Sequence, residues 1–223
     1  MYSVPQTGTF EAKETDFVRG FVQPGQVCFD IGASFGWYTV LLSKLVGPAG
    51  HVHAFEPLPH NFEVLQSNVT LNECANVTLN DVALDATDGQ KDLFLPDIGL
   101  TVSLRLHRYK KNYQVISCRT RTLDDYCLEK GISHVDFIKA DIEGAELLML
   151  KGAIETLRRS KPALMLECQS KVTRLFGYEP AELFTLLAEL GYAPHFVADT
   201  GSLVHVDDYH GRLPDYNFIF LPH

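Results

Sequence analysis

Short apolar runs alternate along the chain with longer segments whose apolar residues recur every three to four positions. Val27 to Ile31 and His51 to Phe55 are runs of the first kind, and their nearly continuous apolar character is typical of parallel strands covered on both faces. Tyr38 to Val46, between them, has helical spacing and stops at Gly47-Pro48. The first third of the chain therefore predicts a strand–helix–strand unit.

The same alternation extends in both directions from this unit. A short helix is predicted from Glu11 to Phe21, before the first strand. Phe62, Leu65 and Val69 predict the next helix, and Asn76 to Ala83 predicts a third strand. This β-α-β-α-β order is half of a doubly wound sheet.

The pattern is irregular in the middle of the chain and resumes afterwards. We expect an insertion or lid at about residues 85–120, with short strands at Leu93–Leu95, Thr101–Leu104 and Val115–Arg119. The later predicted elements are a helix from Thr122 to Gly131, a strand at Val135–Lys139, a helix from Glu143 through Leu157, a strand at Ala163–Leu166, a helix that starts at Pro180 and ends before Gly191, and an antiparallel pair at Tyr192–Val197 and Asn217–Leu221.

These elements predict one α/β domain over residues 1–223. Its expected fold is Rossmann-like and doubly wound, with helices on both faces of a mostly parallel seven-stranded sheet and an antiparallel C-terminal strand. The Asp85–Gln114 region and the loops at Lys171–Glu179 and Thr200–Asp215 would lie over the rim of this sheet, where a substrate could be recognised.

Charge narrows the range of partners. The chain of 223 residues has a formal net charge of −9. Such an average surface repels polyanions, so nucleic acid is disfavoured as a substrate. The basic residues between Arg105 and Lys111 form one local exception, which we interpret as a solvated loop face.

Cysteine usage bears on the cellular compartment. The five cysteines are odd in number and show no C-x-x-C spacing, which predicts a reduced, cytoplasmic protein. No apolar run approaches the ~18–20 residues that span a membrane, and no signal peptide opens the chain. The sequence leaves a homo-oligomer open.

Two glycines bracket the turn that follows the first predicted strand, Gly32-Ala-Ser-Phe-Gly36. Glycine here lets the backbone approach a ligand lying across the strand end. Glu56 ends the second strand, where a carboxylate can accept hydrogen bonds from both hydroxyls of a ribose. Asp81 closes the third strand, where an adenine amino group could donate to it, although a turn or capping role fits it equally well. The pattern predicts a nucleoside site.

Asp30, the acid that precedes this turn, discriminates between nucleoside ligands. Dinucleotide sites hold a pyrophosphate at the turn and the helix N-terminus, and a carboxylate there would repel that anion. The third glycine of G-x-G-x-x-G is also missing, which disfavours a nicotinamide dehydrogenase. A ligand with an ammonium and a sulfonium group suits the acid better, so we expect S-adenosylmethionine.

Several further segments, taken in order, resemble a known family. Asp30-Ile-Gly-Ala-Ser-Phe-Gly36 is similar to the first motif of class I methyltransferases. Phe55-Glu-Pro57, Asp81-Val-Ala-Leu84 and Ile138-Lys-Ala-Asp-Ile-Glu-Gly-Ala-Glu146 follow, and together they resemble the FkbM-type family of S-adenosylmethionine-dependent methyltransferases. The resemblance covers about Phe17 to Glu167, with Ser34 where the family usually has asparagine. The predicted cofactor-binding residues are Asp30, Gly32, Ala33, Ser34, Gly36, Glu56, Pro57, Asp81, Val82 and Asp141.

The resemblance implies transfer of a methyl group to a hydroxyl of a small molecule or glycan. Such a reaction needs an oxygen aligned with the S–CH₃ bond and a base for its proton. Asp141 and Glu167 end the fourth and fifth strands at the ligand-binding rim. Asp141 is the first candidate for the base, followed by Glu143 and Lys139, with Glu167 as a further candidate. Structural roles also fit: a helix-dipole partner for Glu143, an ion pair for Lys139 and a cap for Glu167.

Asp141 and Glu167 also raise the question of a metal. Two strand-end carboxylates could bind Mg²⁺ and polarise a diol. Some other O-methyltransferases do this with Asp-Asn after the fifth strand, whereas this chain has Glu167-Cys168. We therefore expect no metal. N- or C-methyl transfer and a non-catalytic S-adenosylmethionine-binding module remain open as alternatives.

Overall fold

The computed structural model describes residues 10–96, 113–211 and 213–223. Its strands are β1 (Val27–Ile31), β2 (His51–Phe55), β3 (Val77–Asn80), β4 (Ala83–Leu84), β5 (Gly89–Pro96), β6 (Tyr113–Arg121), β7 (Phe137–Ala140), β8 (Ala163–Glu167), β9 (Tyr192–Val197), β10 (Leu203–His205) and β11 (Asn217–Pro222). Its helices are α1 (Ala12–Phe21), α2 (Trp37–Val46), α3 (Pro59–Leu71), α4 (Leu123–Lys130), α5 (Glu146–Lys151), α6 (Ile154–Ser160), α7 (Ser170–Thr173), the 3₁₀ turn η1 (Arg174–Phe176) and α8 (Pro180–Glu189).

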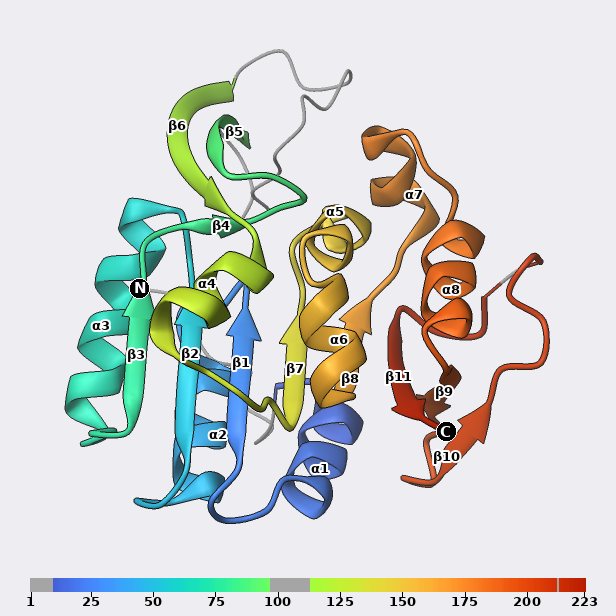
Figure 1. Ribbon diagram of the computed structural model, residues 1–223, viewed down its shortest axis with the longest axis horizontal. Helices are drawn as coiled ribbons and strands as arrows, with labels where there is room; N and C mark the ends of the chain where they lie inside the picture. The colour runs from blue at the N-terminus through green and yellow to red at the C-terminus, as the bar shows by residue number, and fades with distance from the viewer. Residues whose placement is uncertain (1–9, 97–112, 212) are drawn as a thin grey trace.

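Eight strands form the main sheet in the order β10-β9-β11-β8-β7-β1-β2-β3 (Figure 1). β1 pairs in parallel with β2 on one side and with β7 on the other, whereas β11 is antiparallel to both β8 and β9. The strand order reverses at β1, which places a crevice at the carboxyl ends of β1 and β7. The predicted fold class is confirmed.

Helices cover both faces of the sheet, and the alternation of side chains along each strand divides the core. Phe29 and Ile31 of β1 pack in the cluster that contains residues of α4, α5, α6 and α8, whereas Cys28 packs with α1 and α2. Because side chains alternate along a strand, Asp30 points to the same side as Cys28. Lys139 of β7 is its register partner, so the two charged side chains meet under the α1–α2 layer.

Two strand predictions need correction. The main sheet has eight strands rather than seven, because β10, in a segment expected to be a loop, pairs antiparallel with β9. The predicted third strand, Asn76–Ala83, is interrupted after Asn80. Its last residue belongs to β4, which pairs with β6 in a separate three-stranded sheet. The chain leaves the main sheet at this point, and the next strand, β4, pairs in parallel with β6.

The segment expected to be irregular contains an antiparallel pair. β5 and β6 pair from Gly89 with Thr120 to Pro96 with Tyr113, which is longer than the short strands predicted at Leu93–Leu95 and Val115–Arg119. The predicted strand at Thr101–Leu104 lies outside the described residues. This small sheet sits above the carboxyl ends of β1 and β2 (Figure 1).

The helix predicted from Glu143 through Leu157 is two helices. α5 begins only at Glu146, because Glu143 and Gly144 have φ values of 55° and 101°, outside the helical range. The chain then breaks at Gly152, where a Cβ atom would lie 2.1 Å from the Asp85 carbonyl oxygen. At the break the chain therefore lies against the backbone of a distant segment, with no room for a side chain.

Other predicted details are confirmed. Thr122 precedes α4, and its hydroxyl accepts a hydrogen bond from the Asp125 N–H (3.1 Å), as expected of a capping residue. Pro180 opens α8, where its missing N–H leaves no helical hydrogen bond unmade. Within the described ranges, every helix is too short or too polar to cross a membrane.

Candidate functional site

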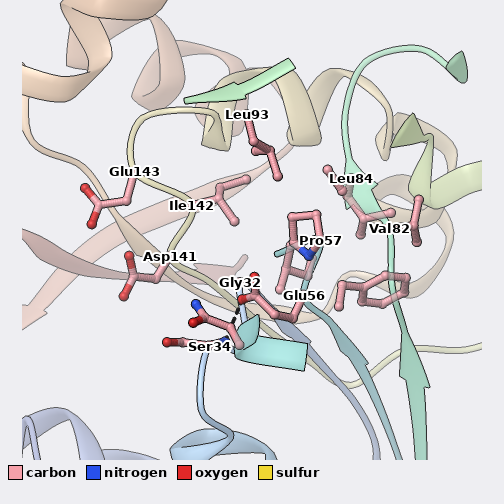
Figure 2. A pocket seen from close by; sticks show the side chains of 14 residues that line it. Gly32, Ser34, Glu56, Pro57, Val82, Leu84, Leu93, Asp141, Ile142 and Glu143 are labelled. Carbon is pink, nitrogen blue, oxygen red and sulfur yellow. Dashed lines mark hydrogen bonds between the residues drawn. The ribbon is translucent and has the colours of Figure 1, made fainter. Parts of the chain in front are cut away.

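A pocket opens at the carboxyl ends of β1, β2 and β7, at the point where the strand order reverses. Its polar lining side chains are Ser34, Glu56, Asn61, Asp141 and Glu143. Its larger apolar lining side chains are Ile31, Phe55, Pro57, Val82, Leu84, Leu93 and Ile142. Figure 2 shows Asp141 and Glu143 on one side and Val82 and Leu84 on the opposite side. The pocket therefore offers acids at one end and an apolar slot at the other.

The glycine turn after β1 forms the floor of this pocket. Gly32 has a φ of 73°, and a Cβ atom there would lie 2.0 Å from the Asp141 carbonyl oxygen. The amides of Gly32 and Ala33 both donate to the Phe55 carbonyl oxygen at 3.0 Å, which joins the turn to β2. Gly36, with a φ of 90°, is the residue before α2 and packs against Leu65. Of the predicted turn residues, Gly32 and Ser34 line the pocket, and Ala33 packs in the α3 core cluster.

Glu56 is held rigidly at the end of β2. It is buried, with 5% exposure, and it lines the pocket. One of its carboxylate oxygens accepts a hydrogen bond from the Ser34 N–H at 2.8 Å (Figure 2). The other accepts from the Leu58 N–H at 2.9 Å. Burial raises the pKa of this carboxyl, and the two backbone hydrogen bonds oppose that rise. A carboxylate has about four acceptor positions, so Glu56 retains two for a ligand.

Asp30 and Lys139 lie beneath the pocket, and neither is among the residues that line it. The Lys139 Nζ atom is 3.8 Å from Asp30 Oδ1 and 3.8 Å from Asp141 Oδ2. The Thr39 hydroxyl donates to the second Asp30 oxygen at 2.5 Å. Burial acts to lower the Lys139 pKa, but the charges of Asp141 and Asp30 outweigh it and the pKa is raised.

This geometry changes the interpretation of both residues. Lys139 is a buried strand residue that pairs with two carboxylates and does not line the pocket. This is the ion-pair role that the sequence offered as an alternative to catalysis. Asp30 is fully buried and its charge is balanced by Lys139. Asp30 does not line the pocket, so its carboxylate does not face a ligand. The preference for a cationic ligand therefore cannot come from Asp30.

The two predicted site residues that follow the third strand, Asp81 and Val82, differ in their relation to the pocket. Val82 lines the pocket, as does Pro57 at the end of β2. The Asp81 carboxylate is exposed and accepts from the Arg119 guanidinium at 2.7 Å, so it is directed toward β6 and does not line the pocket.

Glu167 lies at the end of β8 beside the acidic end of the pocket, without lining it. Burial, together with the negative charges of Asp141 and Glu143, raises the pKa of Glu167 to about 9. Gln169 donates to one Glu167 oxygen at 2.5 Å. Glu167 is therefore protonated at neutral pH and is a poor acceptor for a proton. Within the described ranges, no three His, Cys, Asp or Glu side chains are arranged to hold a metal.

The raised pKa of Glu167 predicts a pH-dependent stability. The folded-state pKa of about 9 exceeds the ordinary value of 4.5, so its contribution is fully present below pH 4.5 and is lost as pH rises toward 9. Glu167→Gln keeps an acceptor for Gln169 and cannot ionise. We expect its free energy of unfolding to exceed that of the wild type increasingly from pH 5 to pH 9, measured by urea denaturation. A constant difference across that range would contradict this assignment.

Several residues with a place at the site escaped the sequence analysis, and Asn61, Leu93 and Glu146 are the most informative. Asn61 lines the pocket from the first turn of α3, and its only sequence signal is its position shortly after Glu56-Pro57. Leu93 reaches the pocket from β5, and nothing in its local sequence indicates this. Glu146 is almost fully buried behind the loop that follows β7.

Comparisons with known proteins agree with the fold and give the family. The profile of the Methyltransferase FkbM domain matches residues 30–194. The 31-O-demethyl-FK506 methyltransferase FkbM of Streptomyces tacrolimicus is 27% identical over 158 residues, which cover 59% of this chain and 60% of that protein. The 2-O-methyltransferase NoeI of Sinorhizobium fredii is 30% identical over 154 residues, which cover 62% of each protein. The chain thus spans about three-fifths of the length of these curated relatives.

Solved structures extend the likeness of fold over nearly the whole chain. Methyltransferase FkbM from Methylobacillus flagellatus KT has a TM-score of 0.56 at 19% identity, covering 91% of this chain and 45% of that one. The O-methyltransferase from Bacillus cereus in complex with SAH has a TM-score of 0.54 at 14% identity, covering 97% and 82%. The domain match spans most of the chain, includes the glycine turn, Glu56 and Asp141, and shows that this chain belongs to the FkbM methyltransferase family.

Proposed function

We propose that this chain is an S-adenosylmethionine-dependent methyltransferase that transfers a methyl group to a hydroxyl of a small molecule or sugar. The observation that carries the proposal is Glu56: a buried carboxylate fixed by two backbone amides at the switch-point pocket, with acceptor positions left for a ribose diol. The family membership supports methyl transfer, and the names of the two curated relatives specify oxygen as their acceptor atom.

The lining of the pocket suits the parts of this cofactor. Glu56 suits the ribose. Pro57, Val82 and Ile142 provide apolar surfaces for the adenine ring. Gly32 lines the floor, where the methionine portion can approach its backbone, and the missing Cβ lets the Asp141 backbone lie close beside it. The acidic end, at Asp141 and Glu143, suits the positive charges of that portion.

The cofactor supplies an activated methyl group and departs as a neutral thioether. The protein has to align the acceptor oxygen and take its proton, so that the O–CH₃ bond forms as the S–CH₃ bond breaks. Asp141 lines the pocket at the end of β7 and is the carboxylate we assign as proton acceptor. Glu167, with a pKa of about 9, would instead be a hydrogen-bond donor at neutral pH.

The proposal is tested by incubating the protein with methyl-labelled S-adenosylmethionine and a panel of hydroxylated small molecules and sugars. We expect S-adenosylhomocysteine release together with a labelled methyl ether. Asp141→Asn should lower turnover more than it lowers cofactor affinity, because proton acceptance contributes roughly 10²–10⁴-fold to such reactions. Absence of any S-adenosylmethionine binding in calorimetry would overturn the proposal, and label on nitrogen or carbon would overturn the choice of oxygen.

Glu56→Ala provides a test of the ribose contact that needs no acceptor. Hydrogen bonds to a charged group contribute about 1.5–3 kcal/mol each, so we expect the S-adenosylhomocysteine Kd to rise about tenfold or more. Calorimetry measures this directly. Glu63→Ala, on the exposed face of α3, is the matched control and should leave the Kd unchanged. An unchanged Kd in Glu56→Ala would remove Glu56 from the ribose role.

A further inference from the structure

The loop between β7 and α5 contributes three residues to the pocket wall, namely Asp141, Ile142 and Glu143 (Figure 2). Its backbone is unusual. Glu143 has a φ of 55°, which few residues other than glycine adopt, and Gly144 has a φ of 101°. For a residue other than glycine such a conformation is strained, and it persists only where its surroundings hold it.

Glu146 holds this loop from behind. It is the first residue of α5, has 1% exposure, and is not among the residues that line the pocket. One of its carboxyl oxygens accepts hydrogen bonds from the Ile142 N–H (2.9 Å) and from the Gly144 N–H (3.3 Å). A single side chain thus fixes the backbone on both sides of the strained Glu143.

The opposite side of the loop leaves little room for movement. A Cβ atom at Gly144 would lie 2.8 Å from both the carbonyl carbon and the carbonyl oxygen of Val172, in α7. The Asp141 carbonyl oxygen would likewise lie 2.0 Å from a Cβ at Gly32. The loop is therefore packed between the glycine turn and α7, and Glu146 determines which way its amides point.

We infer that Glu146 is a positioning residue, which sets the conformation of the 141–144 loop and thereby the cofactor-facing positions of Ile142 and Glu143. The inference rests on the proposed function, because the ligand that the loop faces is the cofactor. Burial raises the pKa of the Glu146 carboxyl to about 8, so the group is mostly neutral at pH 7 and glutamine is a close mimic of it.

The chain contains a matched control. Asp124 also accepts two backbone hydrogen bonds, from the Glu155 N–H (3.0 Å) and the Thr156 N–H (2.8 Å), at the start of α6. It does not line the pocket. Asp124→Ala and Glu146→Ala therefore each remove one carboxyl and two hydrogen bonds from backbone amides. Only the second change should alter the cofactor site.

The experiment measures the S-adenosylhomocysteine Kd of the full chain by calorimetry at pH 7, with thermal unfolding alongside. Glu146→Ala should raise the Kd about tenfold, the equivalent of one or two hydrogen bonds. Glu146→Gln and Asp124→Ala should stay within about twofold of the wild type. If the alanine variant does not fold, Glu146→Asp replaces it. The aspartate side chain is one methylene too short to hold both amides, so we expect its S-adenosylhomocysteine Kd to rise several-fold.

Three outcomes would overturn the inference while leaving the proposed function intact: a folded Glu146→Ala or Glu146→Asp variant with wild-type affinity, a glutamine variant as weak as these, or an Asp124→Ala variant as weak as Glu146→Ala. A wild-type chain that binds no S-adenosylhomocysteine would overturn the proposed function itself, and the inference with it.

Discussion

Gly32→Ala is expected to abolish detectable cofactor binding and to lower the free energy of unfolding by about 2–5 kcal/mol. Two effects combine. Alanine at a φ of 73° is strained, and its Cβ would lie 2.0 Å from the Asp141 carbonyl oxygen and 2.8 Å from Ile142 Cγ2. The first of these neighbours is backbone, so relief requires the turn after β1 to separate from the loop after β7. The pocket lies between these two segments.

Gly131→Ala is the control for Gly32→Ala. Gly131 follows α4 with a φ of 65°, and a Cβ there would meet no atom within 4 Å. Gly131→Ala therefore measures the cost of the backbone strain alone, about 1–2 kcal/mol of unfolding free energy, without a steric contact. Urea denaturation gives the stabilities, and calorimetry with S-adenosylhomocysteine gives the binding. Equal losses of stability in the two variants, or retained binding in Gly32→Ala, would show that the close contact is unimportant.

Lys139→Met is expected to lower the free energy of unfolding by about 3–5 kcal/mol at pH 7, because it leaves a buried carboxylate without its partner. Asp30 is fully buried and has Lys139 as its ion-pair partner at 3.8 Å. Methionine retains most of the length of the lysine side chain, so the change removes charge more than volume. Urea denaturation at pH 7 is the direct measurement.

The pH dependence of Lys139→Met separates charge from packing. Burial already raises the pKa of Asp30 above its ordinary value of 3.8, and loss of the Lys139 charge would raise it further. Asp30 is then neutral at lower pH, so the stability difference from the wild type should shrink as the pH falls from 7 to 5. The double variant Asp30→Asn with Lys139→Met should recover part of the loss. The exposed Lys151→Met is the control. A loss that is independent of pH, and that Asp30→Asn does not relieve, would mean that packing dominates.

The buried charges beneath the glycine turn also bear on the chemistry. Lys139 is 3.8 Å from Asp141, the proposed proton acceptor, and its Nζ atom lies 5.3 Å from the centre of the Tyr38 ring. Its effect on the reaction would therefore be exerted through Asp141 and not by contact with a substrate. Glu167, at the next strand end, is buried beside the negative charges of Asp141 and Glu143, and this environment raises its pKa to about 9.

Local sequence patterns predicted the first half of the fold with little error. The strands at Val27–Ile31 and His51–Phe55 have the predicted bounds, because fully covered parallel strands are nearly continuous apolar runs and turn residues end them. The two-glycine turn and the acid at Glu56 were recognisable for the same reason: each is a short signal next to a strand end. The prediction of the third strand was wrong at its end. No local sequence signal indicates that Asp81 leaves the main sheet or that Ala83 joins the smaller one.

By itself, the sequence determined most strands and helices of the main sheet, a pocket at the first strand's carboxyl end, and Glu56 as an acid that lines it, since periodicity and turn chemistry are properties of neighbouring residues. Only the tertiary structure decided that Asp30 is neutralised by Lys139, that Leu93 closes the pocket and that Glu146 holds its wall. These facts depend on strand register and on contacts between distant segments, which bring together side chains and amides that no local pattern relates.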